Sequence, residues 1–367
     1  MPGIYDADTH IAEPSVMWDH MPSEFYSRRP VIVSVPPDTI YGTSDHMWLI
    51  DGHIYPRTAG RGSAFLVTPV EQTFVQGMPD ISARDMTDLD SRIAEMDRLG
   101  TETQVVFPTL FLTYLTDDAP LEVALCKAYN RHMAEVCAKS GGRIDWTLIP
   151  PLRDIEASVE EVKFGAANGA VGVFFRGIER DRTLDDPYFF PVYEEAQAKN
   201  LTITIHQGSG SPALNSLVDV RRSHTFTHGR IPPIVAFRNL VANRIPEDFP
   251  NLRWGFIEAG LSWVPYALHQ LRTLGHDPVE WGPKLFDKYN MWIAYEVDED
   301  LPYLVKYVGE DHVVTGTDFA HHGRDGTIAD PSAQLHMVET IRSREEYPAS
   351  LVDKMLIDNP RALFGYS

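Results

Sequence analysis

The sequence predicts an α/β protein built as one closed (β/α)8 barrel, and two observations carry that prediction. Eight short apolar segments recur along the 367 residues, nearly all separated by segments with helical periodicity. Continuous apolar strands that alternate with helices pair in parallel, and eight of them close into a barrel. A doubly wound open sheet is the alternative, which is disfavoured because no glycine-rich phosphate turn follows the first strand.

The predicted strands are short and end in polar residues or glycine. In chain order they are DADTHI from residue 6, TQVVFPT from 103, IDWTLIPP from 144, AVGVFFRG from 170, TITIHQG from 202, LRWGFIEAG from 252, MWIAYEV from 291 and HVVTGTDF from 312. Amphipathic segments such as LDSRIAEMDRLG, which ends at the favourable C-cap Gly100, supply the helices between them.

One irregular stretch interrupts this alternation. Residues 15–87, after the first strand, mix many prolines with aromatic residues and lack a helical or strand period. A stretch of this length is too long for a plain loop, so we expect an insertion with short hairpins that covers a pocket. We treat residues 1–367 as a single domain that carries this insertion.

Charge and cysteine content exclude several classes of function. The chain has 52 acidic and 32 basic residues, a net charge of −20, which argues against nucleic-acid and membrane partners. Cys126 and Cys137 fall on one predicted helix, so neither a disulfide framework nor a cysteine zinc site is expected. No apolar run reaches about 18 residues and no leader pattern is present, so we expect a cytoplasmic enzyme.

Polar residues stand at most of the predicted strand ends. Asp8 and His10 share one face of the first strand because strand residues alternate in direction, and Glu13 follows. The other strand-end polar residues are Arg176, His206, Glu258, Glu296, and Asp318 with His321 and His322. A lone residue of this kind is usually structural, but a barrel brings all eight ends into one ring. Several carboxylates that meet there would repel one another, and a bound cation compensates them most simply.

The motifs DADTHIAEP, TITIHQG, LRWGFIEAGLSW, TGTDFAHH and the closing NPRALFG resemble the amidohydrolase superfamily. They resemble in particular its amidohydrolase-related branch, which also holds aromatic-acid decarboxylases. The match runs through the whole chain in the expected order. The resemblance implies a TIM barrel that holds metal on strand-end histidines and carboxylates, with Asp318 on the eighth strand.

Three departures from the hydrolytic pattern shift the expected ligands toward carboxylates. Glu13 replaces the second imidazole of the usual His-x-His, and Glu258 stands where many relatives have histidine. The fourth strand carries Arg176 where binuclear hydrolases have a bridging lysine. Mixed imidazole and carboxylate ligands suit iron or manganese better than a histidine-rich zinc site does.

The resemblance to an oxygen-activating subset of this branch implies a dinuclear non-haem iron monooxygenase. The expected metal ligands are His10, Glu13, His206, His228, Glu258, Asp318 and His321, holding two Fe ions or an Fe/Mn pair. Asp318 and Glu258 are the expected catalytic residues. Partners would be a small-molecule acyl substrate, which many relatives carry on coenzyme A, together with O2 and an external electron donor; a homo-oligomer is left open.

The alternative is a hydrolase or non-oxidative decarboxylase that uses Zn, in which Asp318 acts as general base on a metal-bound water. His228 and His321 are preferred as ligands over His224 and His322. Arg221 and Arg222, with Arg176, are the candidates for binding an acidic substrate group, although solvated surface is the simpler interpretation of the first two.

Overall fold

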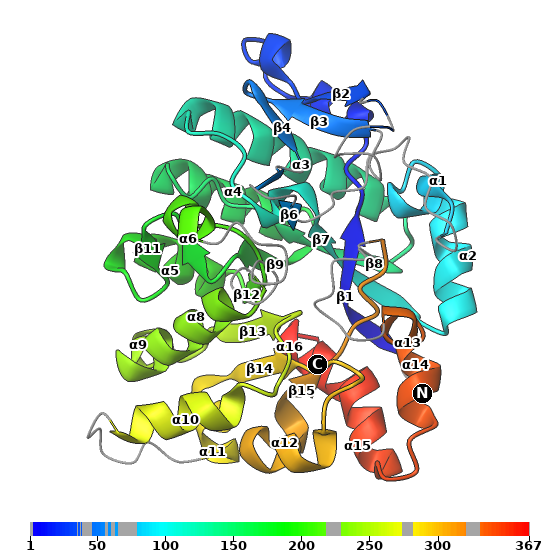
Figure 1. The fold of residues 1–367 in the computed structure, drawn as a ribbon, viewed down its shortest axis with the longest axis vertical. Coiled ribbons are helices and arrows are strands. Elements are labelled where there is room, and N and C mark those ends of the chain that lie inside the picture. Colours follow the sequence, from blue (N-terminus) through cyan, green and yellow to red (C-terminus); the bar gives the residue numbers. More distant parts are fainter. Residues whose placement is uncertain are drawn as a thin grey trace.

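The computed structural model describes residues 3–34, 36, 38, 46–55, 58–59, 63–64, 79–217, 229–273, 282–320 and 331–366. Its centre is an eight-stranded parallel sheet in the order β1-β7-β8-β9-β12-β13-β14-β15 (Figure 1). The strands are β1 (Tyr5–Ile11), β7 (Thr103–Pro108), β8 (Ile144–Leu148), β9 (Ala170–Phe175), β12 (Thr202–His206), β13 (Arg253–Ile257), β14 (Met291–Ala294) and β15 (Val313–Val314). The eight predicted strands and the barrel are therefore confirmed.

The first and last strands meet through the segment that follows β15. Asp318 donates its backbone N–H to the Asp8 carbonyl at 3.0 Å, and His10 donates to the Phe319 carbonyl at 2.8 Å. Gly316 permits this close approach, because a Cβ there would lie 2.3 Å from the Asp8 Cβ. The closure places the Asp8–His10 strand directly beside Asp318.

Helices surround the barrel and begin at acidic N-caps. Asp88, Asp118, Asp154 and Asp300 each accept a backbone N–H from the first turn of the helix that follows. The longer helices are α2 (Leu89–Leu99), α3 (Ala119–Ala138), α4 (Ile155–Ala167), α5 (Phe190–Ala198), α8 (Ile231–Ala242), α10 (Val264–Thr273), α11 (Pro283–Tyr289) and α12 (Leu301–Val308).

Short helices fill the connections and the carboxyl end of the chain. The α-helices are α1 (Ile81–Arg84), α6 (Pro212–Leu217), α9 (Ile245–Asp248), α13 (Pro331–Leu335), α14 (Met337–Arg342), α15 (Ala349–Asp353) and α16 (Asn359–Leu363). The 3-10 and π turns are η1 (Ser15–His20), η2 (Tyr26–Arg28), η3 (Leu110–Leu112), η4 (Pro187–Phe189), η6 (Glu310–His312) and η7 (Lys354–Asp358).

The stretch between β1 and α2 contains short antiparallel strands. They are β2 (Val31–Ser34), β3 (His46–Ile50) and β4 (His53–Tyr55), with the pair β5 (Thr58–Ala59) and β6 (Ser63–Ala64). This subdomain is anchored by aromatic packing, since the Trp18 ring lies 5.9 Å from Trp48 and 6.5 Å from Phe111. Short hairpins were expected here and are present; that the insertion covers a pocket stays a prediction.

The described helices include none that is both long and apolar enough to cross a membrane. Cys126 and Cys137 are buried, unlinked residues of α3, where the sequence placed them together. A further antiparallel pair, β10 (Ile178–Glu179) and β11 (Arg182–Thr183), follows β9 at the carboxyl end of the barrel.

Candidate metal centre

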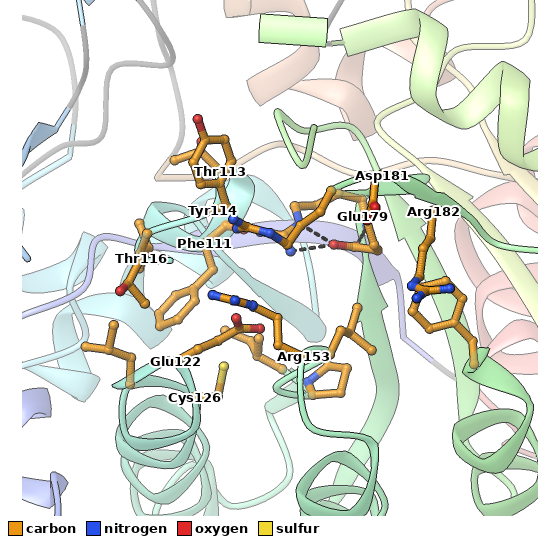
Figure 2. A pocket seen from close by; sticks show the side chains of 18 of the residues that line it. Phe111, Thr113, Tyr114, Thr116, Glu122, Cys126, Arg153, Glu179, Asp181 and Arg182 are labelled. Atoms are coloured by element: carbon orange, nitrogen blue, oxygen red, sulfur yellow. Dashed lines mark hydrogen bonds and ion pairs between the residues drawn. The ribbon is translucent and has the colours of Figure 1, made fainter. Parts of the chain in front are cut away.

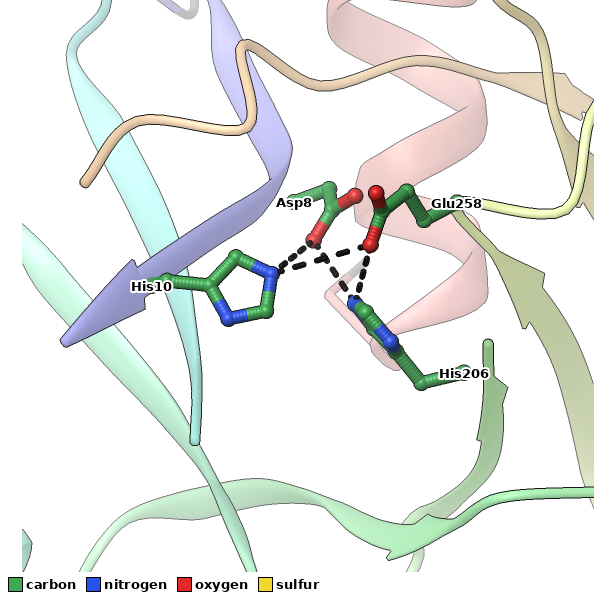
Figure 3. A group of neighbouring side chains, drawn as sticks. All are labelled: Asp8, His10, His206 and Glu258. Carbon is green, nitrogen blue, oxygen red and sulfur yellow. Dashed lines mark hydrogen bonds and ion pairs between the residues drawn. The ribbon is translucent and has the colours of Figure 1, made fainter. Parts of the chain in front are cut away.

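Four buried side chains converge at the carboxyl ends of β1, β12 and β13. Asp8 and His10 project from one face of β1, His206 is the last residue of β12, and Glu258 follows β13 (Figure 3). One ligand atom from each lies within 4.8 Å of the other three. We call these four residues the metal group, because they form a compact set of donors for a single ion.

The two imidazoles of the metal group are oriented by backbone carbonyls. Nδ1 of His10 lies 3.0 Å from the Pro108 carbonyl oxygen, and Nδ1 of His206 lies 2.9 Å from that of Gln207. A carbonyl only accepts, so each Nδ1 carries a proton, and in the neutral ring each Nε2 then carries the lone pair. This is the arrangement that metal-ligating histidines adopt.

Both Nε2 atoms face carboxylate oxygens. His206 Nε2 lies 3.4 Å from Asp8 Oδ1 and 3.4 Å from Glu258 Oε2, and His10 Nε2 lies 3.7 and 3.9 Å from the same two atoms. Lone pairs of neutral imidazoles and carboxylates repel one another at such distances unless a positive charge lies between them. The donors therefore fit a divalent cation, which two carboxylates would neutralise.

A third carboxylate, Asp318, borders the metal group. Its Oδ1 lies 3.4 Å from His10 Nε2. Burial, and after it the negative charge of Asp8, raises the pKa of the Asp318 carboxyl well above its usual range. In this position Asp318 can hold a proton beside whatever the metal group binds.

Glu258 and Asp318 both have a left-handed backbone, with φ of 51° and 53°. Residues with side chains adopt this conformation rarely, and its strain is commonly found at functional sites. The left-handed residue Glu258 follows β13 directly, and Asp318 lies four residues after the end of β15. The strained backbone at Glu258 and Asp318 accompanies the approach of both carboxylates to His10.

A buried polar network supports β1 from below the site. Arg92 donates to the His10 carbonyl at 3.1 Å and to Gln104 Oε1 at 2.8 Å, and its guanidinium lies 4.2 Å from the Phe319 ring centroid. Gln104 in turn donates to Asp6, which accepts both the N–H and the hydroxyl of Thr317. The network ties the His10 segment to the segment that carries Asp318.

The turn after Glu258 is fixed by a second network. Arg230 donates to the Glu258 carbonyl at 3.3 Å and forms an ion pair with Glu296 at 2.6 Å. Burial raises the pKa of Glu296 to about 8, although Arg230 opposes the shift. Glu299 accepts the backbone N–H groups of Leu261 and Ser262. Glu296 was one of the polar residues predicted at the strand ends. In the structure it pairs with Arg230, which in turn contacts the Glu258 carbonyl.

The structure brings together most, but not all, of the predicted site residues that it describes. His10, His206 and Glu258 meet in the metal group, and Asp318 lies beside them. His224, His228, His321, His322, Arg221 and Arg222 lie outside the described residues. Asp8 was absent from the predicted ligands, although its two-residue spacing from His10 already placed both on one strand face.

Glu13 and Arg176 make contacts outside the metal group. Glu13 is buried, and its Oε1 accepts the backbone N–H groups of Thr109 and Leu110 at 2.9 and 2.8 Å. It is not a member of the metal group, so its role as a ligand stays a prediction. Arg176 forms an ion pair with Glu179, and Glu258 is directed at the two imidazoles.

Comparison with known proteins identifies the family. A protein-family model described as Amidohydrolase matches residues 5–366. The chain belongs to the amidohydrolase family. The 2-amino-3-carboxymuconate-6-semialdehyde decarboxylase of Dictyostelium discoideum is 24% identical over 305 residues, which are 76% of this chain and 77% of that protein.

Two solved structures share the amidohydrolase fold seen here. An amidohydrolase from Mycobacterium avium subsp. paratuberculosis K-10 superposes with a TM-score of 0.70 at 20% identity, over 99% of both chains. A variant of 5-carboxyvanillate decarboxylase from Novosphingobium aromaticivorans, solved with bound manganese and 3-methoxy-4-hydroxy-5-nitrobenzoic acid, gives a TM-score of 0.58 at 18% identity. That match covers 75% of this chain and 80% of the other.

These relatives correct the expected reaction. The sequence led us to favour an oxidoreductase, a dinuclear iron monooxygenase, whereas the curated relative is a decarboxylase and so is one of the two solved neighbours. The oxygenase interpretation was wrong. Its error came from the carboxylate-rich ligand set, because such ligands suit several divalent metals and do not by themselves indicate oxygen chemistry. O2 and an external electron donor were expected as partners only because of the oxygenase interpretation, so no reason to expect them remains.

Proposed function

We propose that the protein is a metal-dependent, non-oxidative decarboxylase of an unsaturated or aromatic carboxylic acid. The observation that carries the proposal is the chemistry of the metal group, two imidazoles and two carboxylates with the Asp318 carboxyl beside them. The decarboxylases among the relatives support it. The reaction needs no electron donor, which agrees with a sequence that lacks a flavin or nicotinamide motif.

The proposed centre holds one divalent ion on Asp8, His10, His206 and Glu258. Two ions were expected from the sequence, but the described donors form one group within 4.8 Å. Manganese fits a set of two nitrogen and two carboxylate ligands. When bound, the cation would polarise oxygen atoms of the substrate and help to hold its carboxylate in place.

The protein side chains would perform the proton chemistry. Decarboxylation breaks the carbon–carboxylate bond, leaves its electron pair on the ring or vinyl carbon, and releases CO2. That carbon must then receive one proton. Asp318 lies 3.4 Å from His10 and is buried, so it is the candidate to deliver the proton at that carbon. Burial also keeps bulk water from competing for the site.

Hydrolysis is the second candidate, and the ligand set makes it less suitable. A hydrolase needs an acidified metal-bound water, and anionic carboxylates donate more charge to the ion than imidazoles do, which weakens that acidification. The chain also offers no lysine in AVGVFFRG, the segment of β9, to bridge a second ion. Asp318 would then serve as general base.

The test is anaerobic turnover of a panel of aromatic and unsaturated carboxylic acids by protein loaded with Mn, Zn or Fe. We expect CO2 release at equal rates with and without O2, and incorporation of one deuterium from D2O at the carbon that lost CO2. The Asp318→Asn variant should bind metal but lose turnover. Hydrolysis of amide or ester substrates without CO2 release from the acids would reject the proposal.

A further inference from the structure

A cavity of about 270 Å³ lies at the carboxyl ends of β7, β8 and β9, apart from the metal group (Figure 2). Its charged lining residues are Arg153, Arg176, Arg180, Arg182, Glu122, Glu179 and Asp181. We call it the arginine chamber. None of the four metal-group residues lines it. Its volume is near the lower end of the roughly 300–1,000 Å³ typical of small-molecule sites.

Four guanidinium groups and three carboxylates line the chamber, and two carboxylates outside its lining, Asp117 and Asp186, pair with Arg180 and Arg182. Arg176 is matched by the buried Glu179, with which it forms an ion pair. Arg180 is paired through Nη2 with Asp117, a largely exposed carboxylate whose attraction is screened by water. Arg180 Nη1 is buried and has no hydrogen-bond acceptor among the described residues. The chamber therefore has donor capacity for an added anion.

Glu122 cancels this positive charge only in part near neutral pH. It points from α3 into the same space as Arg153 (Figure 2). Burial raises the pKa of the Glu122 carboxyl to about 7, against the opposing effect of Arg176 and Arg153. Near neutral pH the group is thus protonated in a large fraction of molecules and can donate a hydrogen bond to an oxyanion.

The chamber also has an apolar wall against which the body of a ligand can pack. Its uncharged wall includes Phe111, Leu125, Ile149, Leu152, Tyr188 and Phe189. The Arg182 guanidinium lies 4.3 Å from the Tyr188 ring centroid, and that of Arg180 lies 5.2 Å from Tyr114. Such stacking orients a guanidinium group. Arg182 already donates through Nη1 to Asp186, so Arg180 Nη1 is the donor that an added anion can meet.

The backbone around Arg176 is closely packed at Gly210. A Cβ at Gly210 would lie 2.1 Å from the Ile178 carbonyl oxygen and 3.2 Å from Arg176 Nε. Arg180 donates its own N–H to the Gly210 carbonyl at 2.9 Å. The loop after His206 therefore packs against the segment of Arg176 and Arg180, which holds the arginines in place before any ligand binds.

We propose that the arginine chamber is a second ligand site, separate from the metal group, that binds a small organic oxyanion on an apolar body. The ligands we expect are aromatic molecules with a carboxylate or phosphate group. The arginines of the chamber would bind that group through charge-assisted hydrogen bonds. The site is independent of the reaction proposed for the metal group.

The test is isothermal titration of the full chain with benzoate, phenyl phosphate and the neutral isostere benzamide. We expect saturable binding of benzoate, of phenyl phosphate or of both, and benzamide at least about tenfold weaker. Arg180→Gln should weaken anion binding at least about tenfold, since it removes the charge and keeps the length. Arg153→Gln provides a second variant should the first fail to fold. Arg98→Gln is the control, because Arg98 pairs with Glu95 on the exposed face of α2.

A Glu258→Gln variant separates the two regions in the same titration. Retained anion binding in that variant supports a separate site, whereas its loss would place the anion at the metal group and overturn the proposal. Equal affinity for benzamide, unchanged affinity in both arginine variants, or no binding of either anion by the wild type would also overturn it. The last result would mean that the chamber holds water only.

Discussion

The carboxyl end of the barrel presents two regions of opposite character. The metal group gathers carboxylates and neutral imidazoles from β1, β12 and β13, and it fits a cation. The arginine chamber gathers guanidinium groups from the loops after β8 and β9, and it fits an anion. Residues on or directly after strands hold the first region, and loop residues stacked on aromatic rings hold the second. The comparison teaches that one barrel rim can provide both charge environments at once.

The first prediction concerns Glu258, where the largest effect is expected. Glu258→Gln removes an anionic ligand but keeps its size, so metal affinity should fall at least about 100-fold and turnover at least about 1,000-fold. The metal-free variant should unfold at the same or a higher temperature, since one carboxylate fewer faces Asp8. Metal analysis and thermal unfolding measure both effects.

Glu299→Gln is the matched control for Glu258→Gln. Glu299 accepts backbone N–H groups of the same turn, so its loss should lower stability without direct removal of a ligand. If Glu258→Gln kept full metal content and melted lower, Glu258 would be a structural residue and the cation-binding side of the comparison would fail.

The second prediction concerns Arg176. Arg176→Met leaves Glu179 buried without its partner, which should destabilise the fold by about 3–5 kcal/mol while metal content stays unchanged. The double variant Arg176→Met/Glu179→Met should recover most of that loss. Arg182→Met is the control: Arg182 is more exposed and pairs with Asp186, so its loss should cost less than about 1 kcal/mol. Chemical denaturation measures all three. Loss of metal in Arg176→Met would show that the arginine chamber and the metal group depend on each other, against this comparison.

The third prediction is the pH dependence that Glu122 creates. Its pKa is raised from 4.5 to about 7, so the folded state binds more protons than the unfolded state between these values. Wild-type stability should therefore fall, relative to Glu122→Gln, as pH rises from about 4.5 to 7, by at most about 3 kcal/mol, and the difference should level off above 7. Denaturation curves of both proteins at pH 4.5, 6 and 8 measure it. If the difference in the free energy of unfolding between the two proteins did not change with pH, the Glu122 carboxyl would be solvated and its pKa unshifted.

The fourth and smallest effect is expected for Glu13. Glu13→Gln weakens two charge-assisted contacts to Thr109 and Leu110, which should lower stability by about 1–2 kcal/mol. Metal content should be retained, because Glu13 is not in the metal group. Loss of the ion in this variant would confirm the ligand role that the sequence suggested.

The barrel and part of the site could be predicted because local pattern determines them. Apolar strands that alternate with capped helices define the eight-strand order, and parallel closure then brings His10, His206 and Glu258 to one rim. The same two-residue period placed Asp8 on the face of His10, but the predicted ligand set included Glu13 and left Asp8 out. The reaction could not be predicted, since a mixed ligand set is compatible with several chemistries.

The sequence by itself determined the fold and the presence of donor residues at the strand ends, because periodicity and strand-end position are local properties. Only the tertiary structure decided which donors meet. The left-handed turns at Glu258 and Asp318 and the orientation of Glu13 toward backbone N–H groups depend on contacts between segments about 100 or more residues apart. The arginine chamber is of the same kind, since loop residues acquire a shared cavity only when distant strands are placed side by side.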